Sequence, residues 1–207
     1  MDGSVPAQRP PTLTRRWAHR LLALFGWTAD IAWPPAPRAV IVVYPHTSNW
    51  DFVVGIVARY AAGFPVQWVG KDSLFRGPFG TLLRSWGGIP VNRRQSTGFI
   101  GQLMEEFRRR SWMWVVFTPE GTRSYRDYWK SGFYYLALEA KVPVGLAYID
   151  YKRRQVGLQS YIVLTGDVER DLDAMRAVYA GKVGKHPELA GPIRFHEDQG
   201  TAGGWGG

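Results

Sequence analysis

The chain has 207 residues, of which 45% are hydrophobic and 21% are charged. This length suits one packed core, and the composition excludes disorder over most of the chain. The absence of cysteine excludes disulfides, cysteine nucleophiles and cysteine-based zinc sites. The 26 Lys and Arg against 17 Asp and Glu give a net charge of +9, which favours an anionic partner: nucleic acid, a phospholipid surface or a phosphorylated small molecule.

Residues 1–37 are predicted to form an N-terminal arm and a short amphipathic helix. In residues 15–27, apolar side chains recur at helical spacing and arginines lie beside them. This pattern fits a helix on an anionic membrane surface and a helix packed on the protein core equally well. No segment approaches the roughly 18 consecutive apolar residues of a spanning helix, so we expect no transmembrane helix.

Residues 38–183 alternate predicted strands and helices. Strands are expected at 39–44, 66–69, 88–91, 112–117, 144–149 and around 161–164, and helices at 49–59, 77–86, 97–110, 131–140 and 171–179. The run 39–44 is continuously apolar and β-branched, as expected for a strand that is buried on both faces. The alternation predicts a single α/β domain with a mostly parallel central sheet flanked by helices. Residues 184–207 are expected to form a flexible tail.

A polar cluster follows the first strand of this domain, where an α/β sheet gathers its ligand sites. His46 and Asp51 are five positions apart across a predicted strand-to-helix turn. The carboxylate can fix the imidazole tautomer there, so that the other ring nitrogen accepts a proton from a hydroxyl. A histidine that only satisfies a buried polar group is the alternative, because the spacing alone is weak evidence.

Two further clusters follow later strands. Glu120 to Arg123 place a carboxylate, a glycine and a guanidinium in one turn, where Arg123 could clamp a phosphate. By itself, this turn is better explained by a surface salt bridge. The segment that ends at Arg93, together with Lys71, supplies cations past other strands, and it indicates either a pocket for an anionic acceptor or a solvated basic face.

Together these residues resemble the glycerophospholipid acyltransferase family, which contains the lysophosphatidate acyltransferases. His46 and Asp51 match its His-x4-Asp motif, residues 120–123 match its Glu-Gly-Thr-Arg motif, and residues 88–93 match a glycine-led motif that ends in arginine. A proline-led strand follows at residues 142–147. These matches lie in the expected order between about residues 40 and 150, which is more specific than any single motif.

The resemblance implies a membrane-associated acyltransferase that moves a fatty acyl chain from acyl-CoA or acyl carrier protein to a lysophospholipid or glycerol-phosphate-like acceptor. His46 would be the general base and Asp51 its orienting partner, while Arg93 and Arg123 would hold the acceptor's phosphate. The implied substrate-binding residues are Lys71, Arg93, Glu120, Gly121, Thr122, Arg123 and Lys130. The thioester is already activated, so we expect no bound cofactor and no metal.

The expected location is peripheral, at an anionic membrane surface on the cytoplasmic face, and no nucleic acid is expected as a partner. A non-catalytic basic protein on the same scaffold, which binds a membrane surface or nucleic acid, is the alternative. It accounts for the charge and the aromatic residues. It gives no reason for His46, Asp51, Glu120 and Arg123 to occur together.

Overall fold

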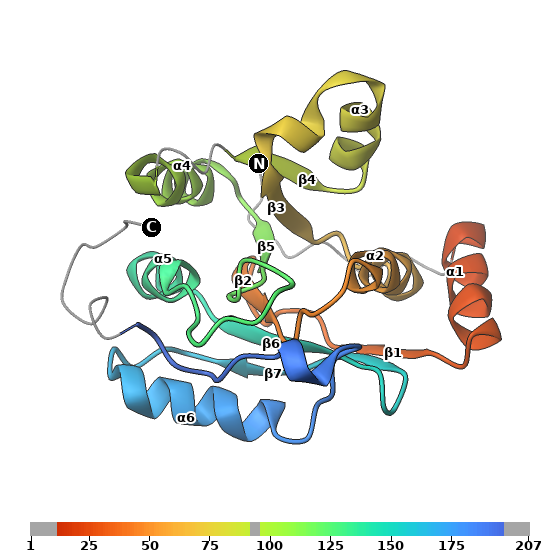
Figure 1. Cartoon of the computed structure of the whole chain (residues 1–207). Coiled ribbons are helices and arrows are strands. Elements are labelled where there is room, and N and C mark those ends of the chain that lie inside the picture. Colours follow the sequence, from red (N-terminus) through yellow and green to blue (C-terminus); the bar gives the residue numbers. More distant parts are fainter. Residues whose placement is uncertain (1–11, 92–95, 197–207) are drawn as a thin grey trace.

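A seven-stranded sheet forms the centre of the computed structural model, which describes residues 12–91 and 96–196 (Figure 1). The strands are β1 (Thr28–Ile31), β2 (Arg38–Val43), β3 (Gln67–Lys71), β4 (Gly88–Val91), β5 (Met113–Phe117), β6 (Val144–Asp150) and β7 (Gln155–Ile162). Their order across the sheet is β1-β7-β6-β2-β5-β3-β4. All neighbouring pairs are parallel except β6 and β7. The predicted α/β fold with a mostly parallel sheet is confirmed.

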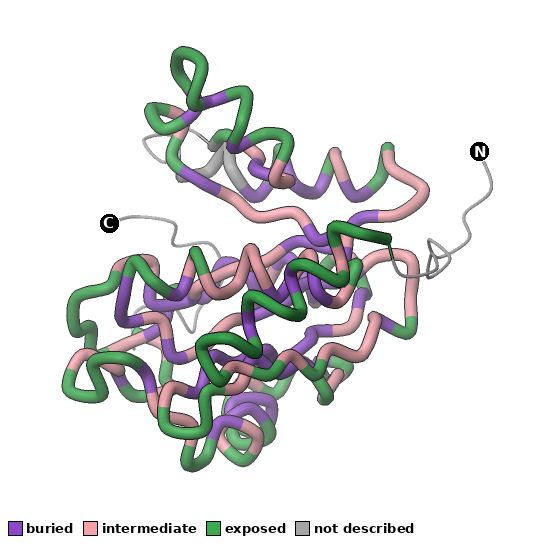
Figure 2. The backbone as a smooth tube through the Cα atoms, turned by 90° about the vertical axis from the view of Figure 1, so that its right-hand side faces the viewer, coloured by how far each residue is buried: buried purple, intermediate pink, exposed green. Residues whose placement is uncertain are grey.

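Helices cover both faces of the sheet (Figure 1). The helices are α1 (Leu13–Leu24), α2 (Trp50–Ala62), α3 (Gly77–Ser85), α4 (Ser96–Arg109), α5 (Gly132–Ala140) and α6 (Val168–Tyr179), with 3-10 turns η1 (Asp72–Phe75) and η2 (Pro187–Leu189). Helices α4, α5 and α6 share one hydrophobic core, and α1 and α2 share another. Figure 2 shows the buried segments running through the middle of the molecule, inside an exposed outer layer.

Strand β2 lies at the middle of the sheet and anchors the loop that follows it. Successive side chains of a strand point to opposite faces, and here both faces are covered. Val40 and Val42 enter the core beneath α4, α5 and α6, while Ala39 and Ile41 enter the core on the other face. These four residues are at most 1% exposed. The chain segment that leaves β2 is therefore anchored at its start.

The sheet differs from the sequence-based expectation at strands β1 and β7. Strand β1 was not predicted, and β7 begins at Gln155 instead of near residue 161. The first half of β7 contains Gln155 and Gly157, which weaken its apolar pattern. A Cβ atom at Gly157 would lie 2.2 Å from Cζ of Tyr148, so this strand requires glycine where the tyrosine ring crosses it.

Helix α1 packs on the protein and still exposes apolar side chains. Ala18 and Leu22 are buried against α2, and Arg15 Nε donates a 2.8 Å hydrogen bond to the Ala61 carbonyl. The alternative of a helix packed on the core is thus observed. The exposed apolar residues of this region are Leu13, Trp17, Leu21, Leu24 and Phe25. Among the described residues, no helix combines the length and apolarity needed to cross a membrane.

Candidate active site

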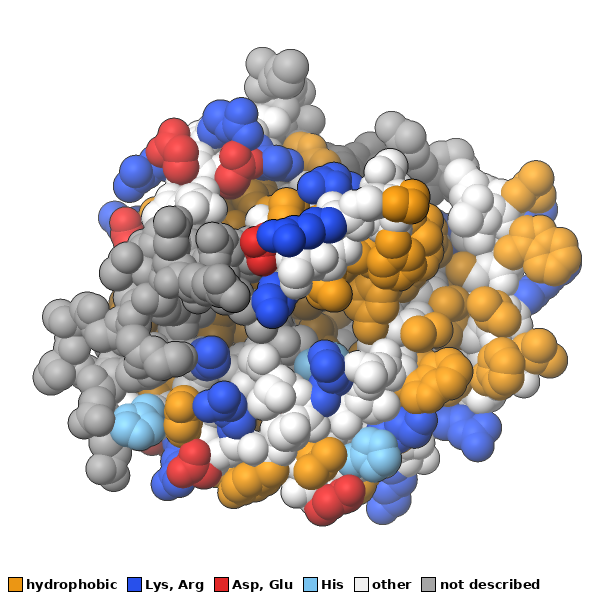
Figure 3. Space-filling model, turned by 45° about the horizontal axis from the view of Figure 1, so that its top comes forward, with side chains coloured by type: hydrophobic (Ala, Val, Ile, Leu, Met, Phe, Trp, Pro, Cys, Tyr) orange, Lys and Arg blue, Asp and Glu red, His pale blue; other side chains and the backbone are white. Residues whose placement is uncertain are grey.

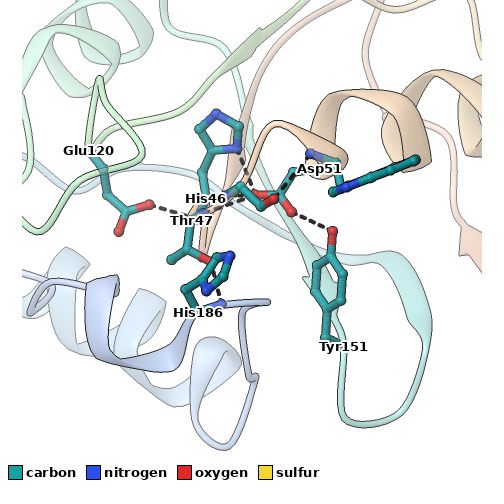
Figure 4. Close-up of polar contacts among 8 residues, drawn as sticks. His46, Thr47, Asp51, Glu120, Tyr151 and His186 are labelled. Carbon is teal, nitrogen blue, oxygen red and sulfur yellow. Dashed lines mark hydrogen bonds and ion pairs between the residues drawn. The ribbon is translucent and has the colours of Figure 1, made fainter.

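The His46 loop connects the end of β2 to the first turn of α2. His46 Nδ1 lies 3.1 Å from Oδ2 of Asp51. The same oxygen accepts 2.9 Å hydrogen bonds from the backbone N–H groups of Thr47 and Ser48. Figure 4 shows the imidazole turned so that one ring nitrogen faces Asp51 and the other points away. The expected contact between His46 and Asp51 is therefore present in the structure.

The Asp51 carboxylate is buried and held in its charged form. Asp51 is 3% exposed. Burial alone would raise the pKa of its carboxyl group. Hydrogen bonds from His46, Tyr151 and Ser48 outweigh burial and hold the pKa of Asp51 below its ordinary value. A charged carboxylate beside Nδ1 favours the tautomer with its proton on that nitrogen, which leaves Nε2 as an acceptor.

Tyr151 is a site residue that the sequence analysis missed. Its hydroxyl donates a 2.8 Å hydrogen bond to Oδ1 of Asp51. Tyr151 directly follows β6, which runs parallel to β2, so both strands end at the same edge of the sheet. The position after a strand was the available signal. A tyrosine is undistinguished, however, in a chain that contains ten of them.

Glu120 connects the second motif to the first. It follows β5, the other neighbour of β2, and is 2% exposed. Its Oε2 accepts a 2.7 Å hydrogen bond from the His46 backbone N–H, and Oε1 accepts a 3.4 Å bond from the Gly191 N–H. Burial raises the pKa of Glu120 to about 7, although both amides oppose this shift. The side chain thus contacts the loop of the histidine rather than solvent.

The rest of the Glu-Gly-Thr-Arg turn faces outward. Gly121 has a φ of 66°, and a Cβ there would lie 3.2 Å from the Lys130 side chain, so glycine suits both the turn and the lysine that lies over it. Thr122 Oγ1 accepts a 3.3 Å hydrogen bond from the Ser124 N–H. Arg123 and Lys130 are both exposed. The turn therefore presents two cations near the buried Glu120.

The remaining predicted binding residues lie farther along the sheet. Lys71 is exposed at the end of β3, which is separated from β2 by β5. It lies at the same sheet edge as His46, two strands away. Arg93 lies outside the described residues.

Residues 184–196, expected to belong to a flexible tail, contact the site over their described length. The His186 N–H donates a 3.1 Å hydrogen bond to Thr47 Oγ1, and a Cβ at Gly184 would lie 2.7 Å from that oxygen. Gly191 donates to Glu120, as described above. This segment has little apolar periodicity, and its packing combines these backbone contacts with the side chains of Ile193 and Phe195, which lie against the main hydrophobic core.

Most backbone amides around the start of α2 already have acceptors, which limits where an oxyanion could bind. The engaged amides are those of His46, Thr47, Ser48, Trp50 and Asp51. Ser48 Oγ accepts from the Trp50 N–H at 3.2 Å, which is a helix-start role rather than that of a nucleophile. Within residues 12–91 and 96–196, no three His, Asp or Glu side chains are grouped to hold a metal.

Comparisons with known proteins identify a family and a similar fold. Residues 34–148 match the family model described as Acyltransferase, a range that contains His46, Asp51 and Glu120. The fold is similar to the crystal structure of PlsC from Thermotoga maritima, a 1-acyl-sn-glycerophosphate (LPA) acyltransferase. That match has a TM-score of 0.51 and 16% identity and covers 80% of this chain and 76% of that chain. No curated protein matches the sequence significantly.

Proposed function

The chain belongs to the acyltransferase family, and we propose that it moves a fatty acyl group from an acyl thioester to a hydroxyl of a lysophospholipid or glycerol-phosphate-like acceptor. The observation that carries this proposal is the 3.1 Å contact between His46 Nδ1 and a buried, charged Asp51, inside the region that matches the family. The similar fold of a 1-acyl-sn-glycerophosphate acyltransferase supports a phosphorylated acceptor. The donor is acyl-CoA or acyl carrier protein.

In the proposed mechanism, His46 Nε2 removes the proton of the acceptor hydroxyl as its oxygen attacks the thioester carbonyl. The imidazolium that forms is stabilised by the Asp51 carboxylate, which stays charged. Collapse of the tetrahedral intermediate breaks the carbon–sulfur bond, and the imidazolium returns its proton to the departing sulfur. The products are an ester and a free thiol, and no acyl-enzyme forms.

The other motif residues divide into two roles in this proposal. Glu120 holds the His46 backbone, because one of its carboxylate oxygens accepts the His46 N–H while the other accepts the Gly191 N–H. Arg123 lies on the neighbouring turn and Lys130 lies against Gly121; both are exposed, and they would bind the acceptor's phosphate. Lys71 and Arg93 are proposed to extend this basic region, and Thr122 shapes its turn.

We further propose that the protein works at an anionic membrane surface. Trp17, Leu21 and Leu24 of α1 are between 45% and 78% exposed, and arginines flank them on the same helix. Leu74 and Phe79 of the η1–α3 region are also more than half exposed. Figure 3 shows hydrophobic side chains gathered toward the right of the view, with Lys and Arg side chains among them. Such a combination suits the headgroup zone of a bilayer.

The test is acceptor-dependent thiol release from acyl-CoA, measured with a panel of lysophospholipids. Because the chain has no cysteine, a thiol reagent detects only the released coenzyme. His46→Ala should abolish release while the protein stays folded. Ser48→Ala should retain most activity, because this hydroxyl is not a nucleophile in the mechanism.

Two outcomes would count against the proposal. Release that persists in folded His46→Ala would remove the general base. Absence of transfer by the native protein, with acyl-CoA and acyl carrier protein donors and all acceptors, would instead favour the non-catalytic alternative. Binding to anionic vesicles without transfer would strengthen that alternative.

A further inference from the structure

Tyr151 occupies a position that none of the matched family motifs includes. It follows β6, and its hydroxyl reaches the one Asp51 oxygen that His46 does not contact. Asp51 Oδ2 interacts with Nδ1 of His46 and accepts two backbone N–H groups, whereas Oδ1 accepts the Tyr151 hydroxyl at 2.8 Å. The carboxylate is thus fixed at both oxygens, which restricts its rotation about the last side-chain bond.

We infer that Tyr151 is a positioning residue, which orients the Asp51 carboxylate and through it the His46 imidazole. This inference rests on the proposed acyl transfer only where activity is the readout. A carboxylate held at Oδ2 alone can turn, and its contact with Nδ1 then lengthens. Burial and, to a smaller extent, the hydrogen bond to Asp51 raise the pKa of Tyr151 well above its ordinary value. The hydroxyl therefore keeps its proton and donates it to the carboxylate in a hydrogen bond.

The tyrosine is itself held by two distant parts of the chain. Its ring packs edge-on against Trp27, with centroids 4.9 Å apart and an interplanar angle of 89°. Trp27 follows α1 closely, and its backbone N–H donates to the Leu22 carbonyl at 2.8 Å. The Tyr151 backbone N–H donates to the Val183 carbonyl, also at 2.8 Å. The N-terminal helix and the segment before Gly184 therefore both fix the donor of Asp51.

The experiment compares Tyr151→Phe with Tyr148→Phe. Tyr148 is a matched control, because it lies near the end of β6, the strand that Tyr151 follows. Its hydroxyl donates a 3.2 Å hydrogen bond to Gln155, away from the dyad of His46 and Asp51. Tyr151→Phe should lower kcat about tenfold or more with KM for both substrates changed less than about twofold. Tyr148→Phe should change neither value by more than about twofold, and both variants should remain folded by circular dichroism.

A second readout does not depend on activity. In protein labelled with 15N-histidine, His46 is one of four histidines and is assigned from its absence in His46→Ala. The native protein should show the tautomer with the proton on Nδ1, and Tyr151→Phe should shift it toward a mixture. Native-like His46 signals and kcat in Tyr151→Phe would overturn the inference. If the native protein transfers no acyl group, the tautomer alone decides, so the two proposals fail separately.

Discussion

The two sides of the site differ in how completely the protein itself surrounds their charges. Asp51 and Glu120 are buried, and the oxygens of both carboxylates interact with donors from the loop of His46, the C-terminal segment or Tyr151. Arg123 and Lys130 lie on the adjoining turn and are exposed. The carboxylates of the buried side are held by the protein itself, whereas the cationic side is open to solvent.

This contrast suggests a division between reaction and recognition. A base that a buried carboxylate already orients stabilises the transition state without reorganising, so the loss of this arrangement should lower kcat. An exposed cation binds the acceptor before and during the reaction, and its loss should raise KM. Substitutions on each side test whether the division holds.

The largest effect is expected on the buried side, from Asp51→Asn. An amide nitrogen turned toward His46 would favour the wrong tautomer, and kcat should fall by about a thousandfold. KM for the acceptor should change by less than about threefold. Steady-state thiol release provides both values, with circular dichroism to confirm folding. A loss of kcat below tenfold would show that Asp51 does not orient the base.

On the exposed side, Arg123→Ala should raise KM for a phosphorylated acceptor by about 10- to 100-fold, because a charge-assisted contact is lost. Arg126→Ala is the matched control, since this exposed arginine of the same loop hydrogen-bonds Tyr128 at 3.2 Å. It should leave KM nearly unchanged. If Arg123→Ala lowered kcat at constant KM, recognition and reaction would not be divided between the two sides.

Glu120 tests the buried side through its pH dependence. Its pKa of about 7 in the folded protein lies above its ordinary value, so the folded state binds more protons between these values. The contribution of Glu120 to the free energy of unfolding is therefore greatest at low pH and decreases as pH rises to about 7. Glu120→Gln removes this dependence and adds only a constant cost for the altered hydrogen bonds.

Urea unfolding of native protein and Glu120→Gln at a series of pH values measures this dependence. Between pH 4.5 and 7.5, the variant should gain about 3 kcal/mol relative to the native protein. Glu105→Gln, an exposed glutamate of α4, should show no such trend. A difference that stays constant for Glu120→Gln would mean that this carboxyl titrates at its ordinary pKa.

The sequence predicted the parts of this molecule that depend on local pattern. The apolar run of β2 and the alternation of strands and helices predicted the α/β fold, and the motif spacing predicted the contact between His46 and Asp51. It did not predict β1, Tyr151 or the contacts of residues 184–196, because these depend on tertiary pairing. The Tyr151 hydroxyl reaches Asp51 across 100 positions, and no local pattern encodes that distance.

The smallest catalytic effect is expected far from both sides, on the exposed face of α1. Trp17→Ser with Leu24→Ser removes two large apolar side chains that are 65% and 78% exposed, so folding should be unaffected. Binding to vesicles containing anionic lipid should weaken about tenfold, because about 2 kcal/mol or less of apolar burial in the bilayer is lost. The kcat of the double variant for acyl transfer to a short-chain, soluble acceptor should stay within about twofold of the native value.

Cosedimentation with vesicles measures the binding, and Thr14→Ser on the same helix is the control. Equal vesicle binding by the double variant and the native protein would exclude α1 as the membrane contact. A large loss of kcat with the soluble acceptor would have a different meaning, namely that α1 supports the dyad through the contact between Trp27 and Tyr151. In that case the N-terminal helix would belong to the buried side of the comparison, despite its exposed face.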